Sequence, residues 1–284
     1  MVCAVLWRAL FRLDFYIMKA KKVLFITQEM VPFVPETPKS HMGRFLPQRI
    51  QEAGHEIRTF TPKWGIINER RNQLHEVIRL SGMNLIIDET DHPLIIKVAS
   101  ISQARMQIYF IDNDDYFMRR KMATDDAGEE YSDNGERAIF FARGVLETVK
   151  KLLWVPDVIH CYGWISALAP LYIKKAYADE PSFRDTKVVF SASSVELKKD
   201  FGRHTAKCVP FKNAKPADLA DVVKTKFGYN DLQKLAIKFS DGMVLDDAKV
   251  SKSVIKYAED RGIPVLPYQG DDFAQAYSNF YENL

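Results

Sequence analysis

The first residues with the chemistry for a ligand site lie in the segment from Gln28 to Met42. Lys39 lies within this segment and carries a charge that could meet an anion. A phosphate-binding turn, however, needs glycines, because backbone N–H groups must come close to the anion. Gly43 is the first glycine of the chain, and the segment before it is rich in proline. Lys39 is therefore either a contact for an anionic ligand or a solvated loop lysine.

A strand before this segment and a helix after it would position its side chains. The apolar run from Lys21 to Thr27 predicts a strand that is buried on both faces. Three prolines indicate that residues 28–40 neither continue this strand nor begin a helix. Apolar spacing from Phe45 to Ala53 predicts the helix, and residues 56–61 predict a second strand. Ligands of open α/β sheets bind beyond the carboxyl ends of the strands, so we expect residues 28–42 to face the ligand.

The cysteines and histidines show no metal-binding pattern. Cys3, Cys161 and Cys208 lie far apart and have no C-x-x-C spacing, so neither a disulfide framework nor a zinc site is indicated. The histidines are dispersed, and no carboxylate cluster has the spacing of metal ligands. The sequence therefore predicts no metal and no cofactor. It favours a reducing, cytoplasmic location.

Composition argues against several classes of function. The chain has 284 residues, of which 47% are hydrophobic, so it can bury the core of one large domain or two small ones. A formal net charge of +3 gives no reason to expect a nucleic-acid partner, because such binding usually needs clustered basic residues. The apolar run from Val2 to Ile17 contains charges and is too short to span a membrane. We predict an extension at residues 1–17, or alternatively a weak amphipathic helix there, and a domain at 18–284.

The remaining pattern alternates strands with helices. Residues 66–92 predict short strands in a hairpin or an antiparallel edge, and residues 118–133 predict a charged surface loop. Charged residues and prolines between 196 and 216 predict a flexible excursion. The alternation predicts an α/β fold with a Rossmann-like, doubly wound, mostly parallel sheet. Further strands are expected at 97–101, 106–111, 187–191, 242–245 and 262–268, and further helices at 134–151, 232–239, 251–261 and around 273–280.

Four blocks of sequence are distinctive: VLFITQEMVPF at 23–33, YFIDNDDYF at 109–117, YSDNGER at 131–137 and PDVIHCYGW at 156–164. In this order and spacing they resemble the bacterial glycogen synthases and the plant starch synthases, which are GT-B glycosyltransferases. The resemblance covers roughly residues 18–265 and implies one Rossmann-like half of a GT-B fold. It also implies glucosyl transfer from ADP-glucose to an α-1,4-glucan, in a crevice between this half and a second one.

The sequence departs from this family where the donor should bind. Pro35 stands where a family lysine holds the diphosphate, and Ile165 stands where a family histidine contacts the donor sugar and phosphate. Residues 191–194 replace a Thr-x-His-Asn motif at the end of a strand. An isoleucine can neither donate a hydrogen bond nor carry a charge, so it cannot stabilise transferring charge. We therefore assign no catalytic residue.

The resemblance nevertheless implies a set of residues around a cleft. Asp133 and Asn134 could present acceptors to sugar hydroxyls, or one of them could simply cap the following helix. His160 could line the cleft, or it could be a satisfied histidine at a strand end. The candidate substrate-binding residues are Glu29, Lys39, Asp133, Asn134, His160, Tyr162 and Trp164.

Two hypotheses of different classes follow. The first is a retaining glucosyltransferase that binds ADP-glucose and an α-glucan and works with a separate chain supplying the other half. It predicts that Lys39, Asp133, Asn134 and His160 line a cleft left open at a flat, apolar surface. The second is a non-catalytic descendant with a degenerate active site, which binds a glucan or a protein partner and has a closed crevice. The three losses on the donor side favour the second hypothesis.

Overall fold

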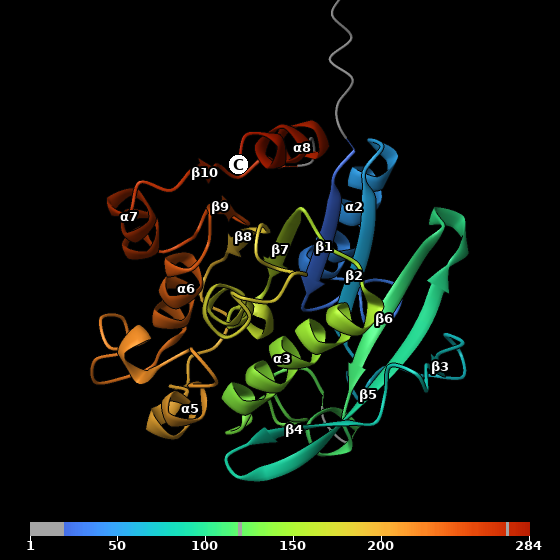
Figure 1. Cartoon of the computed structure of the whole chain (residues 1–284), viewed down its shortest axis with the longest axis horizontal. Coiled ribbons are helices and arrows are strands. Elements are labelled where there is room, and N and C mark those ends of the chain that lie inside the picture. The colour runs from blue at the N-terminus through green and yellow to red at the C-terminus, as the bar shows by residue number, and fades with distance from the viewer. Residues whose placement is uncertain (1–19, 119–120, 271–272) are drawn as a thin grey trace, which may run out of the picture.

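The computed structural model describes residues 20–118, 121–270 and 273–284 (Figure 1). Within these ranges, ten strands form one mixed sheet, and β1 (Lys22–Thr27) lies near its middle. The order along the sheet is β10, β9, β8, β7, β1, β2, β6, β5 and β3, with β4 paired to β5. The extension predicted at residues 1–17 lies outside the described residues.

The parallel part of the sheet is built around β1. This strand pairs in parallel with β2 and with β7, so Phe25 lies beside Thr59 on one side and His160 on the other. Parallel pairs also join β2 to β6, β7 to β8, β8 to β9 and β9 to β10. The predicted α/β fold with a mostly parallel sheet is confirmed. The bounds are Glu56–Pro62 for β2, Met106–Asp112 for β6, Val158–Tyr162 for β7, Lys187–Ala192 for β8, Gly242–Leu245 for β9 and Val265–Leu266 for β10.

An antiparallel edge extends the sheet beyond β6. The long strand β5 (Thr90–Ile101) pairs antiparallel with β6, with β4 (Met83–Ile87) and with β3 (His75–Glu76). The antiparallel edge expected in residues 66–92 is therefore present. Strand β5 begins before the predicted residue 97, because a two-residue turn at Asp88 and Glu89 folds it back onto β4.

Helix α2 (Pro38–Glu52) begins inside the segment that we expected to be a loop. The prediction was wrong because it treated these prolines as incompatible with a helix. A proline in the first helical turn loses no hydrogen bond, so a helix can begin there. Thr37 caps the helix by accepting from the N–H of Ser40, and the Ser40 hydroxyl accepts from the N–H of Thr37. Lys39 therefore lies in the first turn of a helix and not in a loop.

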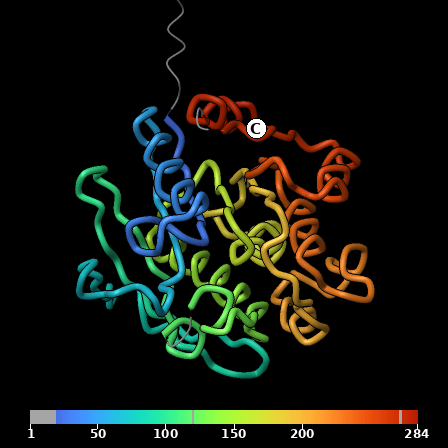
Figure 2. Tube along the Cα trace, turned by 180° about the vertical axis from the view of Figure 1, so that it is seen from behind, coloured from blue at the N-terminus to red at the C-terminus, as the bar shows by residue number. Residues whose placement is uncertain are grey.

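Helices cover both faces of the sheet. Leu24 and Ile26 of β1 point into the larger apolar cluster, together with residues of α3, α6 and α7. Val23 and Phe25 point to the opposite face, where they pack with residues of α2 and α8. Figure 1 shows α3 in front of the sheet, and Figure 2 shows α2 from behind. The bounds are Asn134–Leu152 for α3, Ala169–Leu171 for α4, Tyr229–Lys238 for α6, Lys252–Asp260 for α7 and Ala274–Glu282 for α8.

The segment at 196–216 is more ordered than its sequence indicates. It contains a short helix, α5 (Gly202–Cys208), whose Thr205 is buried and donates its hydroxyl to the carbonyl of Phe201. Phe201 in turn packs against Phe227, with 5.5 Å between the ring centroids. Contacts between distant segments, and not local periodicity, therefore build this part. No helix among the described residues is both long enough and apolar enough to cross a membrane.

Candidate functional site

A cluster of charged side chains lies at the carboxyl ends of the parallel strands. Lys39 Nζ, from the first turn of α2, is 2.7 Å from Glu196 Oε1 and 3.4 Å from Asp246 Oδ2. The three side chains are only 20%, 17% and 7% exposed. We call Lys39, Glu196 and Asp246 the edge triad. Two carboxyl groups thus face one ammonium group.

The topology explains why these residues meet. Gln28 follows β1, Ser193 follows β8 and Asp246 follows β9, while Tyr162 is the last residue of β7. The carboxyl ends of parallel strands meet at one edge of a sheet, which is where ligands bind in open α/β folds. The edge triad thus occupies the expected place of a ligand.

Glu196 is the centre of a hydrogen-bond network. Its Oε1 accepts from Lys39, from the Ser193 hydroxyl at 3.0 Å and from the Tyr229 hydroxyl. Its Oε2 accepts from Gln28 Nε2 at 3.1 Å. Both carboxylate oxygens are therefore satisfied by groups of the protein itself.

The ionisation of the edge triad follows from burial and mutual attraction. Burial acts to raise the pKa of Glu196, but the charge and hydrogen bonds of Lys39 outweigh it and hold this pKa below its ordinary value. Burial acts to lower the pKa of Lys39, but Glu196 and Asp246 outweigh it and raise this pKa. For Asp246 burial prevails over the attraction of Lys39, so its pKa is raised. Lys39 and Glu196 are a charged pair at neutral pH.

Three of the predicted site residues lie at or beside the edge triad. Lys39 belongs to it. Glu29 is buried and accepts from the Thr37 hydroxyl at 2.6 Å, and burial followed by nearby carboxylates raises its pKa. The ring of Tyr162 lies below Lys39, with 5.8 Å from Nζ to the ring centroid.

Trp164 is a core residue next to this edge. It is 2% exposed, and its ring centroid lies 6.4 Å from that of Trp64. Its backbone N–H donates to Gln28 Oε1 at 3.1 Å. Gln28 therefore joins Trp164 to Glu196, and the indole ring itself packs in the interior.

His160 lies in the interior of the sheet and has no exposed surface. Its Nδ1 is 2.5 Å from the Tyr281 hydroxyl of α8, and its Nε2 is 2.7 Å from Ser191 Oγ. Burial lowers the pKa of His160 to about 3, so the ring is neutral. These contacts are those of a satisfied histidine under α8.

Asp133 and Asn134 lie at the start of α3. Asn134 is buried, donates to the carbonyl of Ala123 at 2.9 Å and accepts from Arg137 Nη1 at 2.8 Å. Asp133 is the N-cap residue by position, but its side chain makes no capping hydrogen bond. The expected cap is therefore absent at Asp133, and Asn134 instead ties the preceding loop to Arg137.

The transferase hypothesis predicted that Lys39, Asp133, Asn134 and His160 line one open cleft. The structure does not show this arrangement. His160 is covered by α8, and Asn134 is 4% exposed with both ends of its amide engaged. Their role in substrate binding stays a prediction. The loop before α3 contacts the segment that carries Glu196. The carboxylate of Glu130 accepts from the backbone N–H groups of Lys198 and Lys199, and Lys199 Nζ lies 2.9 Å from Glu129 Oε2.

The residues that the resemblance places on the donor side have structural contacts of their own. Ile165 is completely buried, so it belongs to the core and not to the edge. The hydroxyl of Ser191 binds His160. The backbone N–H of Ser193 donates to Gln233, and the backbone N–H of Ser194 donates to Asp247.

Sequence reasoning missed Glu196, Asp246 and Tyr229. Glu196 lies in a segment without periodicity, and Tyr229 begins a helix 33 residues later. Asp246 could have been found, because it directly follows a predicted strand and must lie at the same edge as Lys39.

A groove runs along the outer side of the segment that carries Glu196. Its volume is about 710 Å³, and its polar lining includes Lys198, Tyr229, Asn230, Asp231 and Lys234. The Oδ1 atom of Asn230 is buried and has no hydrogen-bond partner among the described residues. A second cavity, of about 460 Å³, lies between α5 and residues 216–227 and is not part of this edge.

Comparison with known proteins extends over most of the chain. Residues 22–260 match the sequence family described as "Starch synthase catalytic domain". A glycogen synthase of Pelodictyon phaeoclathratiforme is 39% identical over 175 residues, and one of Chlorobaculum tepidum is 38% identical over 175 residues. Each alignment covers 61% of this chain and 36% of the relative. The chain thus spans about a third of the length of these curated relatives.

A solved structure shows the same fold. The catalytic domain of Starch Synthase IV from Arabidopsis thaliana, bound to ADP and acarbose, superposes with a TM-score of 0.71 at 17% sequence identity. The match covers 88% of this chain and 51% of that one.

Proposed function

The chain belongs to the starch synthase catalytic domain family, and from this premise we propose that it is a synthase-type domain that binds α-glucan but does not transfer glucose from ADP-glucose. The observation that carries the proposal is the edge triad. A diphosphate would have to approach Lys39, whose charge Glu196 and Asp246 already compensate. Because Glu196 already matches the charge of Lys39 in this poorly solvated site, little charge is left to attract a diphosphate.

The surrounding residues support the same conclusion. Transfer needs donors aimed at the charge that develops on the phosphate. Ile165 has no donor and is buried, and the nearby Tyr162 hydroxyl has its pKa raised well above the ordinary value by burial and by the charge of Asp246. Neither residue offers a positive charge at this edge.

A neutral sugar polymer can bind to polar side chains beside the edge triad without carrying a charge of its own. Carboxylate and amide oxygens accept hydrogen bonds from hydroxyl groups without any need for a charged ligand. The groove beside Glu196 is lined by Asn230, Asp231 and Lys234, whose side chains can form hydrogen bonds with sugar hydroxyls. We therefore place the glucan in this groove.

The cytoplasm is the compartment that we propose for this domain. Cys161 and Cys208 are both free. A reducing compartment keeps such thiols reduced.

Isothermal titration of the full chain with ADP, ADP-glucose and maltoheptaose tests the proposal. We expect heat from maltoheptaose and none from ADP or ADP-glucose. Asn230→Ala should weaken maltoheptaose binding, whereas Gln48→Ala on the far side of the fold should not. Binding of ADP-glucose by the wild-type chain would contradict the proposed loss of the donor site.

A charge variant isolates the cause of that loss. In Glu196→Gln/Asp246→Asn, Lys39 keeps its charge without compensation, so we expect ADP affinity to rise by about tenfold or more. Circular dichroism verifies that the variant is folded, and Asp246→Asn alone serves if the double variant is not. An ADP affinity that stays undetectable in a folded variant would show that the edge triad is not what excludes the nucleotide.

The transferase hypothesis needs the second half of a GT-B fold beside this domain. We propose that supplying that half in trans does not restore transfer, since Lys39 stays compensated within this chain. The test mixes this chain with the recombinant second half of the Chlorobaculum tepidum enzyme and measures glucose incorporation into glycogen. Incorporation above that of the added half alone would establish the transferase hypothesis instead.

A further inference from the structure

Three side chains with metal-binding atoms gather between α5 and the turn that joins β4 to β5. Asp88, His204 and Cys208 each place one ligand atom within 4.8 Å of the others. His204 Nε2 lies 3.3 Å from Asp88 Oδ2 and 3.8 Å from Cys208 Sγ. The same Nε2 lies 3.4 Å from Glu136 Oε1, so Glu136 is next to the group through His204.

Three separate elements bring these side chains together. His204 and Cys208 are four residues apart on α5, so they project from one face of that helix. Asp88 lies in the turn between β4 and β5, where its positive φ of 47° belongs to a tight hairpin turn. Glu136 lies in the first turn of α3. Spacing in the sequence could not reveal the group, since its members span residues 88 to 208.

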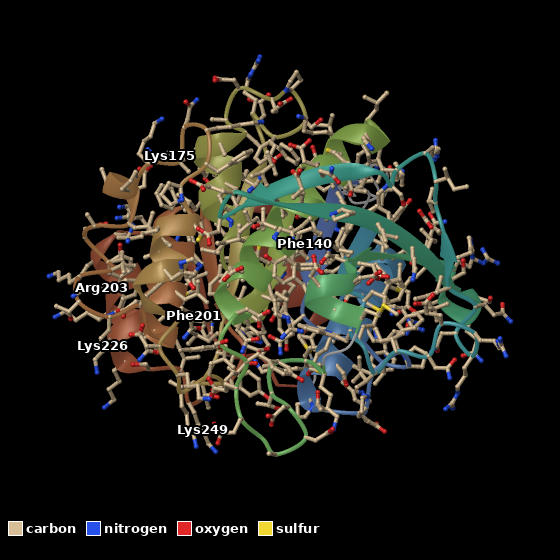
Figure 3. All side chains as sticks on the ribbon, turned by 90° about the horizontal axis from the view of Figure 1, so that it is seen from below. Phe140, Lys175, Phe201, Arg203, Lys226 and Lys249 are labelled. Atoms are coloured by element: carbon tan, nitrogen blue, oxygen red, sulfur yellow. The ribbon has the colours of Figure 1, made fainter. Side chains whose placement is uncertain are left out.

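Packing holds α5 against the start of α3. A Cβ atom on Gly135 would lie 2.2 Å from Thr205 Oγ1, so the glycine allows the two helices to touch. Thr205 is buried, and its hydroxyl donates to the carbonyl of Phe201 at the start of the same helix. Figure 3 shows Phe201 and Arg203, which flank the start of α5, with Phe140 of α3 nearer the centre of the molecule. His204 therefore faces α3 because of a close helix contact.

The distances from His204 Nε2 match those between ligands of a tetrahedral zinc ion. With bonds of about 2.0 Å to nitrogen and oxygen and about 2.3 Å to sulfur, neighbouring ligand atoms lie about 3.3 Å apart for N and O, and about 3.5 Å for N and S. The measured distances from His204 Nε2 are 3.3, 3.4 and 3.8 Å. An ion pair of His204 with the two carboxylates accounts for the first two distances, and the i, i+4 spacing on α5 places the thiol beside them, where it adds a sulfur donor.

A second layer of hydrogen bonds orients the carboxylate. Glu136 presents Oε1 to His204, and its other oxygen, Oε2, accepts from the Tyr116 hydroxyl at 3.2 Å. The Tyr116 hydroxyl also lies 3.1 Å from His92 Nε2. Outer partners of this kind fix the ligands of metal sites.

We propose that Asp88, Glu136, His204 and Cys208 bind one zinc ion, which clamps α5 to α3 and to the turn between β4 and β5. The donor set of one sulfur, one nitrogen and two oxygens suits zinc, which accepts all three kinds of atom in a tetrahedron. The site is separate from the edge triad, so the proposal does not depend on whether the domain binds ADP or glucan.

The test uses the full chain with Zn²⁺ and Co²⁺. We expect one equivalent of Zn²⁺ per chain, measured by competition with a chromophoric chelator, and a rise in the unfolding temperature. Co²⁺ should give the near-ultraviolet charge-transfer band of a thiolate ligand. Cys208→Ser should lose this band and bind Zn²⁺ at least about tenfold more weakly, and Asp88→Asn, on an exposed turn, should also bind more weakly.

Two further variants separate this site from adventitious binding. His75→Ala removes an exposed histidine of β3 outside the group, and it should leave the Zn²⁺ affinity unchanged. Tyr116→Phe should weaken Zn²⁺ binding by about 10- to 100-fold while the thiolate band remains, because only the orientation of Glu136 is affected. Absence of stoichiometric Zn²⁺ uptake by the wild-type chain, or equal uptake and an equal band in Cys208→Ser, would overturn the proposal.

Discussion

The positive charge of Lys39 is compensated by two carboxylates that lie within 3.4 Å of it. Lysine is a compact charge on a flexible stem, so its function depends on the groups around its ammonium. Glu196 and Asp246 turn a potential phosphate contact into part of an internal network. A single residue type is therefore weak evidence for a ligand, and its charged neighbours must be known as well.

His160 is the residue for which pH dependence is predicted most directly. Its pKa is about 3 in the folded chain and 6.5 as the ordinary value, so the unfolded chain binds the extra proton first as pH falls. The stability that the neutral ring contributes is complete above pH 6.5 and declines below it. At pH 5 this one group should make the free energy of unfolding about 2 kcal/mol lower than at neutral pH.

The variant His160→Gln measures this effect. Glutamine can still bond to Tyr281 and Ser191 but does not titrate, so the loss of stability between pH 7.5 and pH 5 should be about 2 kcal/mol smaller than in the wild type. Urea unfolding at the two pH values gives both numbers. His75→Ala, at an exposed histidine, should keep the wild-type pH dependence, and an equally steep loss in His160→Gln would refute the assignment.

Helix α2 illustrates how an element is positioned by one small residue. A Cβ atom on Gly43 would lie 2.0 Å from the carbonyl oxygen of Glu29 and 2.8 Å from Thr27 Oγ1. Close packing of helix on strand at this point needs a residue without a side chain. The same contact sets where Lys39, four residues earlier, meets the edge of the sheet.

Gly43→Ala should therefore destabilise the domain. The added methyl group must push α2 away from β1, and such overpacking costs about 1 to 3 kcal/mol. Chemical denaturation measures the change in the free energy of unfolding. Arg49→Ala, on the exposed side of the same helix, should change it by less than about 0.5 kcal/mol, and equal effects of the two variants would show that α2 is not seated through Gly43.

Helix α8 closes one face of the sheet. Tyr277 and Tyr281 pack beside Val158, Val189 and Val244 in the smaller apolar cluster. Tyr281 also bonds to His160, and Lys21 Nζ donates to the Tyr281 carbonyl. The helix thus covers a strand residue that the family resemblance had associated with a cleft.

Across the whole molecule, burial decreases from the middle of the sheet to its edges. β1 has a parallel neighbour on each side and helices on both faces, so its amides can exchange with solvent only after large-scale opening. β10 and β3 are two-residue strands on the edges of the sheet, and their residues are at least partly exposed.

Hydrogen exchange should follow this order. Amides of β1 and β7 are expected to exchange with a free energy close to that of global unfolding, and those of β3 and β10 close to zero. Mass spectrometry of peptides from the deuterated full chain measures the rates, with the unfolded chain as reference. Equal protection of β1 and β10 would show that the sheet does not open from its edges.

Local patterns determined much of this fold. The apolar runs at 21–27 and 242–245 become β1 and β9, and the stripe at 134–151 becomes α3. Each of these depends on residues close together in sequence, which is what periodicity detects. The motifs that resemble glycogen and starch synthases are likewise continuous stretches, and the family they indicated is confirmed by the match over residues 22–260.

The tertiary structure alone decided how the candidate site is built. Lys39 meets Glu196 and Asp246 across 157 and 207 residues, and His160 meets Tyr281 across 121. The order and register of the strands create these contacts, and no local pattern contains that information. The sequence by itself thus identified the family, whereas the charge balance at the edge and the burial of His160 arose only when distant segments packed together.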